Sequence, residues 1–240
     1  LISAAYLGKD LHKPSVQLST YEKQAKTLRK NIEEYFGAKV EGFNTYQYYE
    51  GNDVLRSWIC IPLTVGIYDR KDETIRALFS PRLWTKDGLL TQAGSETYWD
   101  RSTLYALRGV YACGETEKAT EYLKFYSNQR LLGEHVPYAI EAWPEGSQRH
   151  LSAESGLYCR VITEGLFGIR PTGLKSFKLT PRLPVEWDTM NLRNVKAFGS
   201  SFDIKISRKN NKIDINIYAG SKTLLHKKIN EGETVTVKLP

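Results

Sequence analysis

The sequence predicts a helical part followed by an antiparallel β part, with the change near Pro171. Before that residue, apolar residues recur at steps of three and four, as on one face of a helix. After it, short segments alternate apolar and polar residues and are separated by turns rich in Gly and Asn. We therefore divide the chain into residues 1–170, built of helices, and residues 171–240, which we expect to form an antiparallel β-sandwich.

The clearest predicted helix covers residues 15–36, where Leu18, Ile32 and other apolar residues share one face, and Gly37 is expected to end it. A second helix is expected at about 53–68, although Pro62 must kink or split it. Four more are expected, two of them with N-caps at Asp72 and Ser152. They cover about 72–79, 101–114, 116–130 and 152–166.

These six helices are predicted to pair into three hairpins with alternating short and long connections. The long connections, residues 37–53, 80–100 and 131–151, hold nine of the 28 aromatic residues and three of the five tryptophans. Long connections without secondary structure of their own are uncommon unless they are functional. The alternation places them at one end of the helical part, which is where we expect a binding or catalytic site.

The composition is that of an ordinary globular protein, with 41% hydrophobic, 25% charged and 12% aromatic residues. No apolar run reaches the roughly 18 residues needed to cross a bilayer, so no membrane span is predicted. The net charge of +7 comes from residues 171–240, which hold 13 basic and 6 acidic residues. These lysines and arginines either bind a polyanion or, as is more common, form the solvated face of strands. Nothing in residues 1–170 indicates a nucleic-acid partner.

Three cysteines occur, Cys60, Cys113 and Cys159, each in an apolar helical segment. They lack CxxC spacing and a neighbouring metal-type histidine, so we expect three buried free thiols. A zinc site and a disulfide scaffold are therefore not predicted. No other pattern in the sequence indicates a metal or a cofactor.

Two segments resemble a known family. The stretch "ITEGLFGIRPTGLKSFKLTPRLPVEW", with a P-x-L-P-x-x-W pattern over Pro181–Trp187, resembles the helix-to-β junction of six-hairpin (α/α)6-barrel glycosidases and phosphorylases. The segment beginning "TYWDRSTLYALRGVY" is similar to the "YWRGPxW" region of trehalases and processing α-glucosidases, although Asp100 and Arg101 depart from it. The resemblance covers most of the chain. It implies half of an (α/α)6 barrel followed by a β-domain, with the other half of the barrel in a preceding segment or a separate chain.

Members of this family hydrolyse glycosidic bonds with a pair of carboxylic residues, usually with inversion. Their base is often a Glu in the loop before the last barrel helix, and Glu141 in "IEAWPEG" occupies that position. The resemblance therefore implies Glu141 as general base, with Glu154 as the second choice. The acid is expected in the missing half, or at Asp100. Each carboxylate also has a structural reading: Glu141 and Asp100 as caps of backbone N–H groups, and Glu154 as a charge favoured in a first helical turn.

The aromatic loops supply the expected sugar contacts. Rings of tryptophan stack on the C–H faces of sugars, and the same rings serve equally well as anchors of a loop. Candidate substrate-binding residues are Trp143, Trp99, Trp84, Arg101, Glu134 and His150. Glu145, in "WPEG", is expected to be a solvated turn residue.

Other classes remain open at this point. A polysaccharide lyase on a similar frame uses Tyr, His and Arg, and the sequence offers Tyr138, His135, His150 and Arg149. A glycoside phosphorylase uses phosphate in place of water. A non-catalytic carbohydrate-binding protein is the third alternative. In every case the expected partner is a carbohydrate.

Overall fold

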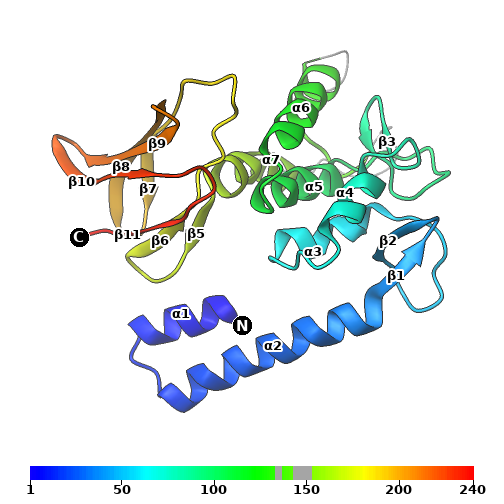
Figure 1. Ribbon diagram of the computed structural model, residues 1–240, viewed down its shortest axis with the longest axis horizontal. Coiled ribbons are helices and arrows are strands. Elements are labelled where there is room, and N and C mark those ends of the chain that lie inside the picture. Colours follow the sequence, from blue (N-terminus) through cyan, green and yellow to red (C-terminus); the bar gives the residue numbers. More distant parts are fainter. Residues whose placement is uncertain (133–136, 143–152) are drawn as a thin grey trace. The chain divides into compact units, whose positions relative to one another are not determined.

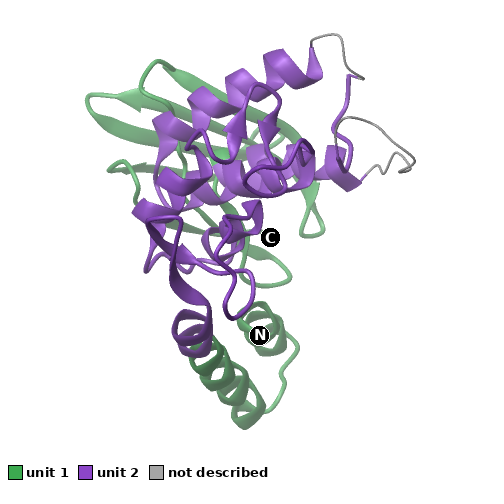
Figure 2. Ribbon diagram, turned by 90° about the vertical axis from the view of Figure 1, so that its right-hand side faces the viewer, with its two compact units in different colours: residues 1–28, 166–240 green, residues 29–165 purple. Residues whose placement is uncertain are grey.

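The computed structural model describes residues 1–132, 137–142 and 153–240. Helices come first and antiparallel sheets follow, which confirms the predicted order of helical and β structure (Figure 1). The chain forms two compact units, residues 29–165 and residues 1–28 with 166–240 (Figure 2). Residues 1–28 therefore belong with the strands, whereas the sequence grouped them with the other helices. The Asp10 carboxylate accepts the backbone N–H of Leu174 at 2.7 Å and joins the first helix to this unit.

The helices are short apart from the second. In chain order they are α1 (Ile2–Asp10), α2 (Ser15–Phe36), the 3-10 helix η1 (Ser57–Cys60), α3 (Ile61–Thr64), α4 (Lys71–Leu78), α5 (Asp100–Ala112), α6 (Thr116–Tyr126), the π-helix η2 (Ser127–Leu131), α7 (Ala153–Arg160) and the π-helix η3 (Val161–Leu166).

The strands of the described residues form four antiparallel sheets. Two hairpins lie in residues 29–165: β1 (Gly37–Val40) with β2 (Phe43–Tyr46), and β3 (Trp84–Thr85) with β4 (Gly88–Leu89). The other unit has a three-stranded sheet in the order β11-β6-β5 and a four-stranded sheet in the order β10-β9-β8-β7. Their strands are β5 (Ile169–Pro171), β6 (Ser176–Leu179), β7 (Thr189–Ala197), β8 (Ser200–Lys209), β9 (Lys212–Ala219), β10 (Lys222–Ile229) and β11 (Val235–Lys238).

Helix α5 is the centre of the unit formed by residues 29–165. Nearly every residue of this helix is buried, including Leu104, Leu107 and Tyr111. Helix α3 packs directly on it, because Gly109 has no side chain: a Cβ at that position would lie 2.7 Å from Cβ of Leu63. This close approach fixes α3 against the second half of α5. The end of η1 meets the start of α5 separately, where the Cys60 thiol donates to the Ser102 carbonyl at 3.8 Å.

The predicted helix at 53–68 is wrong in extent. Only η1 and α3 form there, and Pro62 lies in the first turn of α3, where its missing N–H costs nothing. Gly66 then adopts φ +82° and ends the segment. The predicted N-cap Asp72 is also wrong, because α4 begins at Lys71 with Asp72 inside its first turn.

The predictions for α2, α5 and α6 are confirmed to within a few residues. Gly37 does not cap α2 in the left-handed conformation, because the chain passes directly into β1. Helix α6 continues as the π-helix η2, and α7 continues as η3. The proposed N-cap Ser152 lies outside the described residues.

Two long connections contain hairpins that the sequence did not predict, β1–β2 and β3–β4. They are tied together by Glu41, in the turn between β1 and β2. Its carboxylate pairs with Arg82, just before β3, and accepts the N–H of Leu55. An isolated bridge joins Arg56 to Gln92. The two long connections therefore meet, and both hairpins lie at the same end of their unit in Figure 1.

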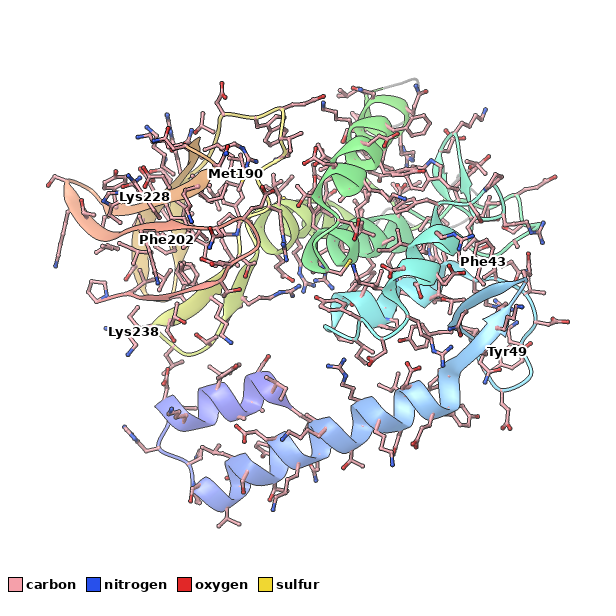
Figure 3. The ribbon with its side chains drawn as sticks, in the orientation of Figure 1. Phe43, Tyr49, Met190, Phe202, Lys228 and Lys238 are labelled. Atoms are coloured by element: carbon pink, nitrogen blue, oxygen red, sulfur yellow. The ribbon has the colours of Figure 1, made fainter. Side chains whose placement is uncertain are left out.

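The strand unit buries a row of isoleucines. Ile204 pairs with Ile217 and Ile206 with Ile215 across β8 and β9, and all four side chains are buried. Phe177 of the three-stranded sheet stacks on Phe202 of the four-stranded sheet with ring centroids 5.7 Å apart. Phe202 is labelled among the side chains of its sheet in Figure 3. The predicted turn at "RKNNK" is confirmed, with both Asn residues at positive φ, as a type I′ hairpin turn requires.

The edge strand β10 carries three exposed lysines, Lys222, Lys227 and Lys228. Charged residues on an edge strand discourage pairing with another sheet, which is one of the two readings of this basic segment. Among the described residues, no helix is long and apolar enough to cross a membrane.

The cysteines agree only in part with the prediction. Cys60 is buried, Cys113 is half-buried and Cys159 is exposed, so the expectation of three buried thiols is wrong for Cys159.

Candidate functional site

A pocket of about 610 Å³ opens in the unit formed by residues 29–165. Its walls come from the end of α2, from β2 and the residues after it, from η1 and α3, and from the start of α5. The lining is apolar and aromatic, and Arg101 is the one charged residue among the described lining residues. They are Ile32, Phe36, Tyr46, Gln47, Tyr48, Trp58, Ile59, Ile61, Pro62, Trp99 and Arg101.

Trp58 and Trp99 form the aromatic centre of this pocket. Their rings meet edge to face, with centroids 4.7 Å apart and an interplanar angle of 78°. Trp99 is extended and caps α5, and its N–H is bonded to the carbonyl of Leu89 at 2.7 Å. Trp58 lies in η1, which α3 holds against α5. Both rings remain partly exposed, so they present apolar faces with their orientation fixed by packing.

Arg101 binds two carboxylates. Its Nη1 lies 3.1 Å from Oε1 of Glu141, and its Nε and Nη2 each lie 2.8 Å from Oε1 of Glu154. The side chain of Glu154 is 0% exposed, whereas those of Arg101 and Glu141 are 28% and 32% exposed. Glu154 therefore holds the Arg101 guanidinium from the buried side. Glu141 is the carboxylate that solvent or a ligand can reach.

Asp100, the residue before Arg101, is buried and binds two partners in the interior of the unit. Its Oδ2 lies 2.9 Å from Nη2 of Arg130 and accepts the backbone N–H of Ile140 at 2.8 Å. Both Asp100 and Arg130 have 0% exposed side chains. Burial raises the pKa of Asp100, while the Arg130 charge and the Ile140 N–H act in the opposite direction. The two neighbours Asp100 and Arg101 thus hold Ile140 and Glu141, respectively.

With this geometry in hand, we compared the chain with known proteins. No family model matches it, and no significant match was found among curated proteins. Its function therefore has to be argued from the site itself.

The predicted carboxylates have distinct positions. Glu141 lies beside Arg101, which lines the pocket. Glu154 is next to the same guanidinium but is fully buried. Asp100 is buried and paired with Arg130, which places it away from any ligand in the pocket. The alternative reading of Asp100 as an N-cap is wrong, because Asp100 is the first residue of α5 and Trp99 is the cap.

The predicted sugar-contacting residues separate into three groups. Trp99 and Arg101 line the pocket. Trp84 does not: it packs in a separate aromatic cluster, 5.3 Å from Phe79 and 4.5 Å from Tyr122 between ring centroids. Glu134, Trp143 and His150 lie outside the described residues, as do Glu145, His135 and Arg149.

Sequence reasoning missed several residues of this site. Trp58 fell inside a segment predicted to be a helix, and only its position four residues before Pro62 hinted at a shorter element. Tyr46 belongs to the β1–β2 hairpin and Tyr48 follows it, in a connection for which the sequence predicts no strands. Arg130 is 30 residues from Asp100 in the sequence, and no local pattern indicates that pairing. Among the described residues, no three His, Cys, Asp or Glu side chains gather as metal ligands would.

Proposed function

We propose that this protein is a glycoside hydrolase that acts with inversion and uses Glu141 as its general base. One observation carries the proposal. The carboxylate of Glu141 is held 3.1 Å from Arg101, and Arg101 lines a pocket whose other described walls are mostly aromatic and apolar. A reachable, oriented carboxylate at the margin of an aromatic pocket suits a sugar ring stacked on tryptophan with a water molecule nearby. The resemblance to six-hairpin glycosidases independently points to the same residue.

The proposed reaction follows the usual inverting scheme. Glu141 accepts a proton from a water molecule, and the water oxygen bonds to the anomeric carbon as the glycosidic C–O bond breaks. An acid on the opposite face gives its proton to the leaving oxygen. Asp100 is too deeply buried for that task, so we assign the acid to a residue outside those described here. A second barrel half, in the same chain or another, is the source that the resemblance implies.

Trp58 and Trp99 are proposed to hold the sugar. Their rings are braced by one another and by the close packing of α3 on α5. A ring that is already fixed loses little side-chain freedom when a sugar stacks on it. The volume of about 610 Å³ leaves room for more than one sugar ring, which favours an oligosaccharide. In this reading, residues 1–170 include half of an (α/α)6 barrel and the two C-terminal sheets are a β-sandwich.

The charge around Arg101 favours a hydrolase over a polysaccharide lyase. A lyase has to bind a negatively charged uronate, and Arg101 is the positive charge among the described pocket residues. It is already paired with Glu141 and Glu154, so the three groups together carry a net charge of −1. A neutral sugar avoids the repulsion that a uronate would meet there.

The test is to incubate the full-length protein with α- and β-linked gluco-, galacto-, manno- and xylo-oligosaccharides of two to six units. Fresh products are followed by proton NMR before they mutarotate. We expect cleavage of at least one oligosaccharide, with the opposite anomeric configuration in the first-formed product. Retention of configuration, a requirement for phosphate, or an unsaturated product absorbing in the ultraviolet would each contradict the proposal. Binding of an oligosaccharide without turnover would favour the non-catalytic alternative.

A further inference from the structure

The segment that carries Glu141 is held from two sides by consecutive residues of α5. Arg101 contacts the Glu141 side chain, and Asp100 accepts the N–H of the preceding residue, Ile140. Ile140 itself is 1% exposed, so this N–H is screened from water. A buried N–H without its acceptor is strongly disfavoured, which makes the bond to Asp100 a firm constraint on the backbone next to Glu141.

Asp100 is in turn fixed by Arg130. Their ion pair is fully buried, and Arg130 comes from η2, the π-helix that follows α6. Two separate elements, the start of α5 and the end of the α6–η2 segment, therefore determine where Ile140 lies. Neither Asp100 nor Arg130 lines the pocket, so a role in contacting a substrate does not explain them.

We propose that Asp100 and Arg130 are positioning residues that set the location of the Glu141 carboxylate through the backbone of Ile140. This inference rests on the proposed function of Glu141. Water activation requires the base to lie within hydrogen-bond reach of the attacking water, and a misplacement of about 1 Å is enough to cost ~100-fold in rate. The pair Asp100–Arg130 holds the backbone at Ile140, next to Glu141, and the pair Glu154–Arg101 orients the Glu141 side chain. Both the backbone position and the side-chain orientation of Glu141 are therefore fixed by α5.

Two double variants isolate the bond to Ile140. Both replace the buried Arg130 by Met, so neither leaves an unpaired buried cation. Asp100→Asn with Arg130→Met keeps an oxygen that can accept the Ile140 N–H. Asp100→Leu with Arg130→Met removes that acceptor. Because the two proteins share the loss of the ion pair, they differ in the acceptor at position 100, which serves the Ile140 N–H and also interacts with the Tyr126 hydroxyl. A readout at the Ile140 amide itself therefore separates the bond to Ile140 from the contact with Tyr126.

The first readout is hydrogen exchange at the Ile140 amide, which needs no substrate. We expect this amide to exchange at least tenfold faster in the Leu variant than in the Asn variant. The second readout is turnover of the oligosaccharide that the wild type cleaves best. We expect kcat of the Leu variant to fall about 100-fold with KM changed less than threefold, and the Asn variant to regain at least tenfold of that loss.

Equal exchange rates in the two variants would overturn the inference, and so would a difference in exchange with equal kcat. A loss that appears in KM alone would also overturn it, since it would indicate a damaged binding pocket. Failure of the proposed function has a separate signature. If Glu141→Gln keeps wild-type turnover, Glu141 is not the base and the positioning role falls with it, while the exchange data still report whether Asp100 holds Ile140.

Discussion

Glu154 and Arg101 form an ion pair in which one partner is sealed in the protein and the other reaches the pocket. Oε1 of Glu154 lies 2.8 Å from Nη2 of Arg101, at side-chain exposures of 0% and 28%. The other oxygen, Oε2, is buried and has no hydrogen-bond partner among the described residues. The described hydrogen bonds of the Glu154 carboxylate therefore go to Arg101, whose guanidinium also contacts Glu141. Its role in this arrangement is to orient Arg101.

Glu154→Gln should test that role. The amide oxygen can still accept from Arg101, and the amide nitrogen replaces an oxygen that had no described partner, so mainly the charge is lost. We expect the free energy of unfolding to fall by about 1 kcal/mol, the difference between a hydrogen bond to a charged group and one to a neutral group. Urea denaturation measures this, with the exposed Glu121→Gln on α6 as a control expected within ~0.5 kcal/mol of wild type. Equal stability of both variants would mean that the charge of Glu154 does not contribute to holding Arg101.

Trp58→Ala should weaken sugar binding more than Trp84→Ala. Trp58 is in the pocket, whereas Trp84 packs with Phe79 and Tyr122 elsewhere. An aromatic contact contributes roughly 0.5–1.5 kcal/mol, so the loss of one ring should raise the dissociation constant by up to about tenfold. Calorimetry with the oligosaccharide cleaved by the wild type provides the comparison. A larger effect at Trp84 would place the sugar at the other aromatic cluster.

The bridge between the two hairpins should depend on pH. The hydrogen bond from Arg82 is the main cause that holds the pKa of Glu41 below its ordinary value. A carboxylate with a lowered native pKa adds stability above its unfolded pKa, near 4.5, and that stability is lost as the pH falls through the native value. We therefore expect Glu41→Gln to be less stable than wild type at pH 7, with the difference shrinking toward pH 3. A constant difference at both pH values would contradict an electrostatic role for Glu41.

The thiols should differ in reactivity. Burial raises the pKa of Cys60 to about 12, and the thiol is enclosed by the packing around α3 and α5. Cys159 is exposed on α7. An aromatic disulfide reagent at pH 8 should modify Cys159 rapidly and leave Cys60 unmodified until the protein unfolds, as peptide mass spectrometry would show. Fast modification of Cys60 in the native protein would mean that this core opens readily.

The sequence predicts most where a local pattern is decisive. Helices α2 and α5 and strands β8 and β9 all form where the sequence predicts them, although no residue of α2 is fully buried. The segment around Pro62 shows where a local pattern fails. The sequence predicts a helix over about 53–68 that Pro62 kinks or splits, whereas the structure contains only a 3-10 turn and four α-helical residues. The hairpins in the long connections are short, and their strands depend on contacts such as Glu41 with Arg82 that no local pattern reveals.

The same holds for the site: the sequence indicates several of its residues but not the long-range pairs that position them. The aromatic loops point to Trp99 and Arg101 and the family resemblance points to Glu141. The structure places Trp99 and Arg101 in the pocket wall with Glu141 beside Arg101. That Arg101 joins Glu141 to Glu154 is a long-range relationship, across 40 and 53 positions of the chain respectively. The pairing of Asp100 with Arg130 is equally remote from any local pattern. Such pairs form because burial of a charge requires a partner, wherever the fold supplies one.

The most direct test of the central claim is the turnover of Glu141→Gln beside that of Glu121→Gln, measured on the oligosaccharide that the wild type cleaves best. The substitution keeps the shape of the side chain and its contact with Arg101 but removes the ability to accept a proton. We predict that kcat falls by about 100-fold to 10,000-fold, the range typical of a lost general base, while the melting temperature and the sugar affinity stay close to those of wild type. Wild-type turnover in Glu141→Gln, with the control equally active, would show that Glu141 is not the base.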